Sequence, residues 1–141
     1  MLNLNPYLHF NGNAEEVMVF YKTVFNSEFT NLQRYGDTPG SEKMAAPERE
    51  KILHISLPVG KGDTIIMATD ILEMMQPTYV TGTNIYLCIN AESEQEVDRL
   101  FMELSAGGSI KMPVNKMMWG AYFGMCKDKF GTQWMISYEH K

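Results

Sequence analysis

The sequence lacks the features that mark membrane, secreted and nucleic-acid-binding proteins. No apolar run approaches the roughly 18 residues that a membrane-spanning helix needs. The first ten residues, MLNLNPYLHF, contain no basic segment followed by an apolar core, so we expect no signal peptide. Twelve Lys and Arg residues against 17 Asp and Glu residues give a net charge of −5. Nucleic acid and anionic membranes are therefore disfavoured as partners, and we expect a cytoplasmic protein.

Cysteine is also scarce, and the two cysteines belong to no metal-binding motif. Cys88 and Cys126 both lie in apolar, strand-like segments. We expect free buried thiols, with a structural disulfide as the alternative. The two cysteines and three histidines show neither CxxC nor HxxxH spacing, so the sequence has no zinc motif. The glycines form neither GxGxxG nor GxxxxGK[ST], which leaves no nucleotide-binding loop.

What the chain does contain is one pattern that occurs twice, a short strand followed by an amphipathic helix. Residues Pro6–Phe25 are echoed in the second half of the chain by Ile85–Leu104. In each copy, apolar residues follow at positions i, i+3, i+4 and i+7, which is one face of a helix. Asn13 and Ser93 each precede a glutamate by three residues, the spacing of a capping box at a helix start. The repeat predicts one module that has been duplicated.

The segments around the two helices predict strands, so that each half reads βαβββ. We expect the strands at Tyr7–Asn11, Glu28–Tyr35, Lys51–Val59, Asp63–Asp70, Thr83–Asn90, Ser109–Met112, Trp119–Cys126 and Thr132–Tyr138. The prediction is a single α+β domain over residues 1–141, with a first module at 1–70, a linker at 71–82 and a second module at 83–141. The polar stretch Gly36–Glu50 has no strand period and is expected to be a loop, either a lid over a site or a mobile surface insertion.

The most informative polar residues lie in the hairpin of the first half. If its turn is centred on Lys61, His54 lies opposite Ala68, and Asp70 is a diagonal neighbour of His54 on the same face. Ser56 shares that face. Four apolar residues are then expected to point the other way, under the helix: Ile55, Leu57, Ile65 and Met67. On this interpretation His54 and Asp70 form a carboxylate-oriented general base, with a structural hydrogen bond at a strand end as the alternative.

Aromatic and methionine side chains gather in the last third of the chain. By strand alternation Trp119 and Phe123 share a face, on which they could stack against a planar or hydrophobic ligand. Trp134 and Ile136 lie on the opposite face from Met135 and are expected under the second helix. The 12 methionines suit an adaptable apolar pocket, or gap-filling in the core and at a subunit interface.

Taken in order, these segments resemble the vicinal oxygen chelate superfamily, which includes glyoxalase I, extradiol dioxygenases and bleomycin-resistance proteins. The resemblance is carried by PYLxFxGNA from Pro6, by His54, by MATD from Met67, by Trp119 with Phe123-Gly124, and by DKFGxxWMI from Asp128. Within the superfamily the chain is most similar to the PhnB-like branch, historically labelled 3-demethylubiquinone methyltransferase. The resemblance implies two paired βαβββ modules whose curled mixed sheet surrounds a cleft, as in glyoxalase, and a homodimer.

Metal-dependent members of this superfamily hold a divalent ion through His and Glu residues on the first and last strand of each module. Carried over to this chain, the four ligand positions fall on Pro6, on one of Ile66, Met67 and Ala68, on Thr83 or Asn84, and on Met135. Proline, aliphatic side chains and methionine cannot bind a hard cation. The resemblance therefore implies no metal and no cofactor here, with a divalent metal as the alternative. A methyltransferase is also not expected, because the turn at 11–13 lies outside an open parallel sheet.

These observations predict a metal-free protein that binds a small aromatic or hydrophobic molecule in the cleft between the modules. The expected ligand contacts are Phe10, which lies on the family's cleft face, together with Ser56, Trp119, Phe123 and Met135. One alternative is a lyase- or dioxygenase-type enzyme that uses His54 and Asp70, with or without a divalent metal. The other is a structural or interaction protein whose cleft is plugged by side chains.

Overall fold

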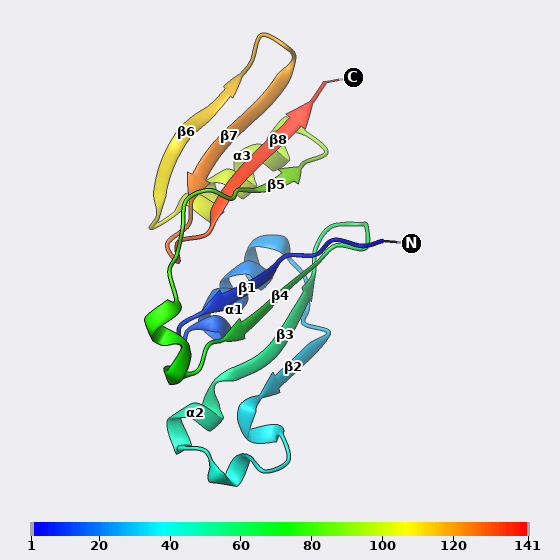
Figure 1. The fold of residues 1–141 in the computed structure, drawn as a ribbon. Helices are drawn as coiled ribbons and strands as arrows, with labels where there is room; N and C mark the ends of the chain where they lie inside the picture. The colour runs from blue at the N-terminus through cyan, green and yellow to red at the C-terminus, as the bar shows by residue number, and fades with distance from the viewer. Residues whose placement is uncertain (1, 141) are drawn as a thin grey trace. The chain divides into compact units, whose positions relative to one another are not determined.

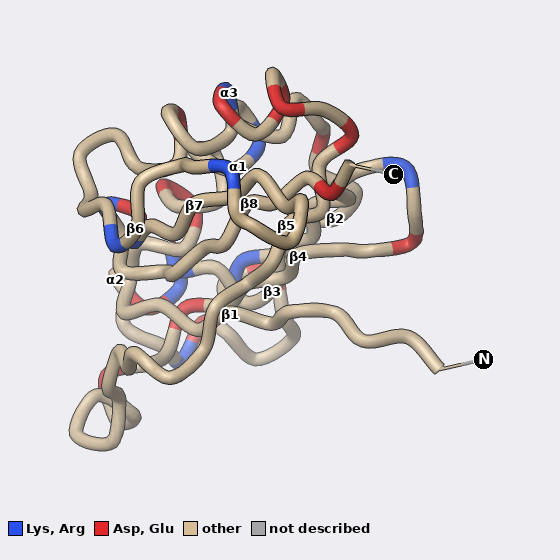
Figure 2. The backbone as a smooth tube through the Cα atoms, turned by 90° about the horizontal axis from the view of Figure 1, so that it is seen from above, with Lys and Arg blue, Asp and Glu red and all other residues tan. Residues whose placement is uncertain are grey.

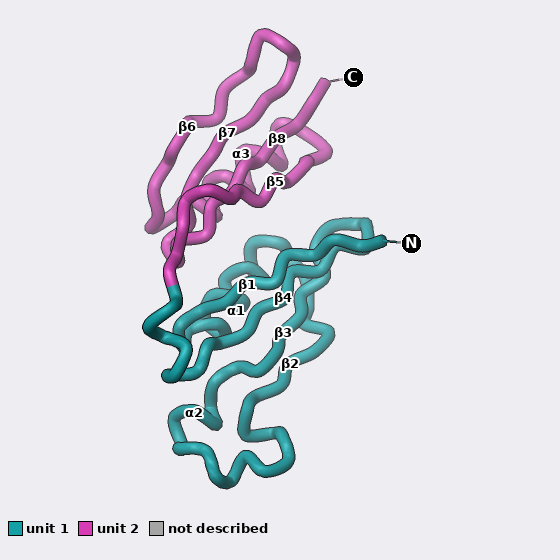
Figure 3. Tube along the Cα trace, in the orientation of Figure 1, with its two compact units in different colours: residues 1–79 teal, residues 80–141 magenta. Residues whose placement is uncertain are grey.

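Two compact units make up the chain, residues 1–79 and residues 80–141 (Figure 3). The computed structural model describes residues 2–140. Each unit contains one long helix and a four-stranded sheet, and the chain builds both in the same order of strand, helix and three strands (Figure 1). The α+β class and the two βαβββ modules predicted by the repeat are therefore confirmed, whereas a cleft between the modules stays a prediction. Within residues 2–140, no helix combines the length and apolarity needed to cross a bilayer.

Unit 1 is a mixed sheet with one helix on one of its faces. Its strands are β1 (Tyr7–Phe10), β2 (Asn31–Arg34), β3 (Ile52–Pro58) and β4 (Ile65–Asp70), in the sheet order β1-β4-β3-β2. Strand β1 runs parallel to β4, and the other pairs are antiparallel. Helix α1 (Ala14–Phe25) buries Val17, Tyr21 and Val24, as its period predicts. Met18 is buried as well, whereas Phe20 is only half-buried.

The polar stretch 36–50 is more regular than a loop. It contains the 3₁₀ helices η1 (Tyr35–Asp37) and η2 (Ser41–Lys43), followed by the short helix α2 (Ala46–Glu50). Pro47 stands in the first turn of α2, where a missing backbone N–H leaves no bond unmade. A further 3₁₀ helix, η3 (Glu73–Thr78), occupies half of the expected linker at 71–82.

The register of the hairpin between β3 and β4 differs by one residue from the expected one. Ile55, and not His54, lies opposite Ala68, and the Val59 N–H donates to the Thr64 carbonyl at 3.0 Å. The turn therefore holds the four residues 60–63, whereas a turn centred on Lys61 has an odd number. Because side chains alternate along a strand, this slip exchanges the two faces of β4 while leaving those of β3 as predicted. The residues of β4 on the α1 side are Ile66, Ala68 and Asp70, and not Ile65 and Met67.

Unit 2 repeats the arrangement with a longer edge strand. Its strands are β5 (Leu87–Asn90), β6 (Ser109–Lys116), β7 (Ala121–Lys127) and β8 (Gln133–Glu139), in the order β5-β8-β7-β6. Helix α3 (Glu94–Ser105) begins at Ser93, whose side chain accepts a hydrogen bond from the Glu96 N–H at 3.1 Å, as predicted. Its apolar face is buried against the sheet.

Close packing of α3 on the sheet explains a glycine in β7. A Cβ atom at Gly124 would stand 2.8 Å from both Phe101 Cε1 and Val114 Cγ2. Such a distance is shorter than any ordinary carbon–carbon contact, so only glycine lets the Phe101 ring lie against the strand. Gly124 therefore lies on the face of β7 that α3 covers.

Candidate functional site

In unit 1 the sheet face opposite α1, called here the helix-free face of unit 1, carries two aromatic residues from β1. Parallel pairing with β4 sets Tyr7 beside Met67 and His9 beside Thr69. The Tyr7 and His9 ring centroids are 4.9 Å apart in an edge-on arrangement, which is a favoured geometry for aromatic pairs. Tyr7 is 47% exposed, so part of its ring is available to a ligand.

Strand β3 adds a hydrogen-bonded pair to this face. His54 Nε2 and Ser56 Oγ lie 2.9 Å apart, and the imidazole tautomer decides which of them donates. The His54 ring centroid is 5.7 Å from that of Tyr7, which confirms that β1 and β3 present these side chains on one face. Tyr7, His9, His54 and Ser56 are called here the aromatic–hydroxyl cluster. They combine aromatic surface with groups that donate and accept hydrogen bonds.

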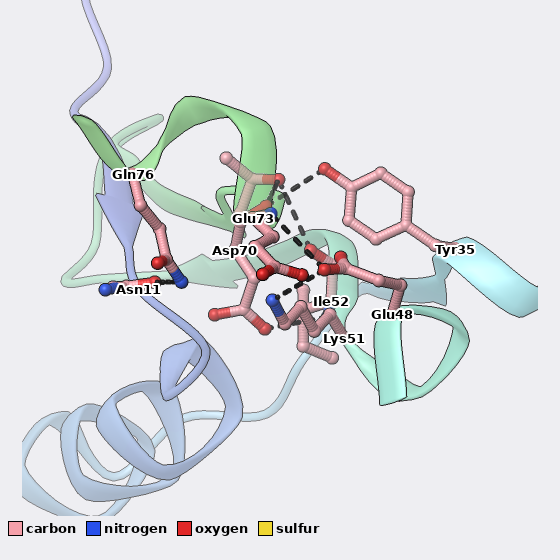
Figure 4. Close-up of polar contacts among 9 residues, drawn as sticks. Asn11, Tyr35, Glu48, Lys51, Ile52, Asp70, Glu73 and Gln76 are labelled. Carbon is pink, nitrogen blue, oxygen red and sulfur yellow. Dashed lines mark hydrogen bonds and ion pairs between the residues drawn. The ribbon is translucent and has the colours of Figure 1, made fainter. Parts of the chain in front are cut away.

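Asp70 does not belong to this cluster, and the predicted His54–Asp70 pair is wrong. The shifted register of β4 turns Asp70 to the α1 side of the sheet, where its side chain is 2% exposed. Its Oδ1 accepts the Ala14 N–H and its Oδ2 accepts the Ile52 N–H, each at 2.8 Å, and Figure 4 shows the second of these bonds. Both carboxylate oxygens are thus bound by backbone groups, so Asp70 cannot orient the imidazole of His54.

Phe10 also lies away from the helix-free face. It pairs with Asp70 in the parallel ladder and is 5% exposed, because it packs on the α1 side. The expected ligand contact at Phe10 therefore does not fit the geometry. Tyr7 and His9 hold the corresponding positions on the helix-free face. Strand alternation puts these two residues on one face of β1, but the sequence alone does not show which face the helix covers.

The helix-free face of unit 2, opposite α3, is richer in apolar side chains. Met125 and Met135 are paired across β7 and β8, and Phe123 stands opposite Ser137. Trp119 precedes β7, is 71% exposed, and has its ring centroid 6.2 Å from that of Phe123. Phe123 itself is 7% exposed. The expected contacts Trp119, Phe123 and Met135 therefore do lie close together in this unit.

Trp134 lies on the other side of that sheet, under α3, as predicted. It is 2% exposed, and its Nε1–H donates to Asp128 Oδ2 at 2.9 Å. Asp128 Oδ1 accepts the N–H groups of Phe130 and Thr132, at 2.9 and 3.1 Å, and so holds the turn before β8. No pattern in the sequence indicated the bond from this aspartate to the tryptophan. Trp134 therefore supports the core and is not a ligand contact.

Three titratable groups in unit 2 are shifted toward their neutral forms. The hydrogen bond from the Tyr122 hydroxyl to Asp98 Oδ1, 2.6 Å long, raises the pKa of Tyr122 to about 12. Burial raises the pKa of the Cys126 thiol to about 11. Burial and the nearby Glu139 carboxylate raise the pKa of Cys88, a residue that is exposed. Both cysteines are free thiols, and neither is activated as a nucleophile.

The donor set does not fit the divalent metal that the superfamily's enzymes hold. Within residues 2–140, no three His, Cys, Asp or Glu side chains converge as ligands of one ion would. His54 is joined to Ser56 instead, and both oxygens of Asp70 are taken by backbone N–H groups. The described side chains therefore do not supply the ligand set of a divalent ion.

Comparison with known proteins assigns the chain to a family. The family model described as 3-demethylubiquinone-9 3-methyltransferase matches residues 3–137. Protein PA1353 from Pseudomonas aeruginosa is 34% identical, with both chains covered in full and a TM-score of 0.82. The PhnB protein from Bacillus cereus is 26% identical over 97% of this chain and 99% of its own, with a TM-score of 0.74.

The fold extends to more distant proteins. A glyoxalase/bleomycin resistance protein/dioxygenase family enzyme from Burkholderia phytofirmans covers 96% of this chain and 97% of its own, with a TM-score of 0.66 at 14% identity, a likeness of fold alone. Together with the match over nearly the whole chain, this confirms the resemblance drawn from the sequence. The chain belongs to the family described as 3-demethylubiquinone-9 3-methyltransferase, the PhnB-like proteins with the glyoxalase-type fold.

Proposed function

We propose that the protein binds a small aromatic or hydrophobic molecule, without a metal ion, through the side chains of its helix-free faces. The observation that carries this proposal is the aromatic–hydroxyl cluster of unit 1. In it, the Tyr7 ring lies against two imidazoles, and His54 is hydrogen-bonded to Ser56 at 2.9 Å. Aromatic rings with a few converging polar groups are typical of small-molecule sites.

The chemistry of unit 2 supports the same proposal. Trp119 and Phe123 offer ring surface, and the paired Met125 and Met135 offer flexible, polarizable side chains. Methionine adapts its shape to a ligand at little energetic cost, and exposed tryptophan stacks well on planar molecules. Both units thus present surface suited to the same class of ligand.

The acid–base enzyme is a weaker proposal on this geometry. A general base of the kind expected needs a carboxylate that orients the imidazole. Asp70 instead accepts two backbone N–H groups on the other side of the sheet. The hydroxyl of Ser56 fixes the His54 ring but cannot stabilise an imidazolium as a carboxylate does.

Thermal-shift screening with uncharged aromatic compounds tests the binding proposal. A ligand at a hundred times its dissociation constant stabilises the folded state by about 2.7 kcal/mol, which gives a clear rise in Tm. We expect His54→Ala to abolish the rise for a ligand that stabilises the wild type. The control variant His140→Ala changes an exposed histidine outside the cluster and should show the same rise in Tm as the wild type.

Elemental analysis of the purified protein tests the second part of the proposal. Stoichiometric zinc, nickel, iron or manganese would contradict metal-free binding. A library that raises the Tm of neither the wild type nor the control, at saturating concentrations, would favour a structural or interaction protein instead.

A further inference from the structure

The helix-free face of unit 1 is uncharged along all four of its strands. Asn31 stands opposite Ser56, and Gln33 stands opposite His54, so β2 continues the polar character of the cluster. None of the strand residues on this face is Asp, Glu, Lys or Arg, although such residues make up 21% of the chain. Strand β1 is accordingly tan throughout in Figure 2, whereas both colours of charge occur on α3.

The helix-free face of unit 2 has the same character over its middle. On its two central strands the charged residues are Lys127 and Glu139, which stand opposite Gln133 and Ala121 at the two ends of the ladder between β7 and β8. Between these ends lie the apolar residues described above, with Ser137 as a hydroxyl group. On β7 and β8, charged residues therefore occur only at the ends of this face.

An uncharged polar face selects its ligand by the cost of desolvation. A carboxylate, phosphate or ammonium group loses its hydration on binding and finds no opposite charge among these side chains, which is expensive. A neutral hydroxyl, carbonyl or amide loses much less and is offered hydrogen bonds by Ser56, His54 and Gln33. The rings of Tyr7 and His9 favour a flat partner.

We infer that the ligand is an uncharged aromatic molecule with one or two hydrogen-bonding groups, of the phenol or aromatic amide class. This inference rests on the small-molecule binding proposed above and narrows it to one class of compound. It also predicts that, of two molecules of equal size and shape, the protein binds the uncharged one more tightly than the charged one.

Four probes built on the same ring system test this discrimination by isothermal titration calorimetry. They are 2-naphthol, naphthalene, 2-naphthoate and 2-naphthylmethylammonium, used at about pH 8, above the ordinary pKa of imidazole and below that of a phenol. We expect 2-naphthol to bind at least roughly tenfold more tightly than either charged probe. Naphthalene, which has the ring but no polar group, should bind more weakly than 2-naphthol.

Gln33 allows a charge to be placed on the face without disturbing the core, because it is exposed and lies on an edge strand. Gln33→Lys should tighten the binding of 2-naphthoate by roughly threefold, and Gln33→Glu should do the same for 2-naphthylmethylammonium. The matched control is Gln95→Lys, at an exposed position on α3, which should leave all four affinities unchanged.

Different results overturn the inference and the proposed function. Equal or tighter binding of a charged probe to the wild type overturns the inference and leaves small-molecule binding in place. The inference is also overturned if the protein binds 2-naphthol but neither Gln33 variant changes the affinity for the charged probes. The ligand would then lie away from Gln33 and this face. Failure of all four probes to bind overturns the proposed function itself.

Discussion

At the scale of single residues, Asp70 joins four segments that are far apart in the sequence. Its carboxylate accepts the N–H groups of Ala14 at the start of α1 and of Ile52 at the start of β3. Its backbone carbonyl accepts the hydroxyl of Tyr35 at 2.9 Å, which ties η1 to the end of β4 (Figure 4). A carboxylate at a helix N-terminus is also favoured by the helix dipole. Asp70 therefore holds unit 1 together and has no free oxygen for chemistry.

Replacing this carboxylate by its amide is expected to destabilise the protein. Asp70→Asn leaves one acceptor oxygen and sets an NH₂ group against a backbone N–H. The loss of one charged, buried hydrogen bond should lower the free energy of unfolding by about 2–3 kcal/mol, measured by urea denaturation. Asp63→Asn, at the exposed turn of the same hairpin, should change it by less than about 0.5 kcal/mol. Equal stability of the two variants would contradict the role assigned to Asp70.

Tyr122 gives a prediction for alkaline pH. Its pKa in the folded state is raised to about 12 by the hydrogen bond to Asp98, whereas an unfolded tyrosine titrates near ~10. The folded state therefore holds this proton more tightly, and the stabilisation is complete below about pH 10 and lost as the pH rises toward 12. Urea unfolding at several alkaline pH values should show a smaller loss of stability for Tyr122→Phe than for the wild type. Asp98→Asn should act in the same way, and an unchanged alkaline loss in both variants would refute the assignment.

At the scale of secondary-structure elements, the two helices begin in different ways despite their similar sequences. Ser93 caps α3 with its own hydroxyl, as the Ser-x-x-Glu pattern predicts. Asn13 has the same position before α1, but its side chain makes no cap hydrogen bond. The start of α1 is instead held by the Asp70 carboxylate of β4, which accepts the N–H of Ala14, the first residue of the helix.

The two N-cap residues are therefore expected to differ in their effect on stability. Ser93→Ala should lower the free energy of unfolding by about 1 kcal/mol, because it leaves the Glu96 N–H without its acceptor. Asn13→Ala should lower it by less than about half of that. Thermal and urea denaturation of both variants measures the difference, and a larger loss at Asn13 would show that the local capping pattern matters more than Asp70.

The hairpin between β3 and β4 shows how far the sequence predicts the site. Local alternation correctly placed His54 and Ser56 on one face of β3 and Ile55 and Leu57 on the other. Which residues of β4 lie on each face depends on the number of residues in the turn. The two glycines on either side of Lys61 suggested a turn centred on that residue. The chain includes Asp63 in the turn, and this single residue exchanges the two faces of β4.

In unit 2 the same reasoning succeeded, because a turn of defined type joins β7 and β8. Asp128 and Gly131 fix that turn, the Gly131 N–H donating to the Asp128 carbonyl at 3.0 Å. With the register known, Trp134 and Ile136 fall under α3, and Met135 falls on the helix-free face. The contact of Tyr7 with His54 could not be predicted, since it depends on which strand becomes the neighbour of β1.

At the scale of the whole molecule, the exposed apolar side chains of unit 2 lead us to propose that copies of the chain associate. Met118 is fully exposed, Trp119 is 71% exposed and Ile110 is 56% exposed, all on unit 2. Ile110 lies on the edge strand β6, and Met118 and Trp119 lie in the turn that follows it. Apolar side chains exposed along a sheet edge are candidates for an interaction surface. We therefore expect a homodimer.

Light scattering after size-exclusion chromatography should give a mass of twice 16.1 kDa. Met118→Glu should shift the equilibrium toward the monomer, because it places a charge within the exposed apolar group. Met102→Glu is the matched control, at an exposed methionine on α3, and should leave the dimer intact. A monomer at every concentration up to about 100 μM would be the contrary result.

The different starts of α1 and α3 also bear on the order in which the chain folds. Helix α3 carries its cap within its own sequence, so its first turn can form before any strand is in place. Helix α1 receives its carboxylate from a residue 56 positions further along, so its start is stabilised only once β4 has joined the sheet. By circular dichroism, an isolated peptide of residues 91–106 should therefore be more helical than one of residues 11–26. Two copies of one pattern would then fold in opposite orders, helix first in unit 2 and sheet first in unit 1.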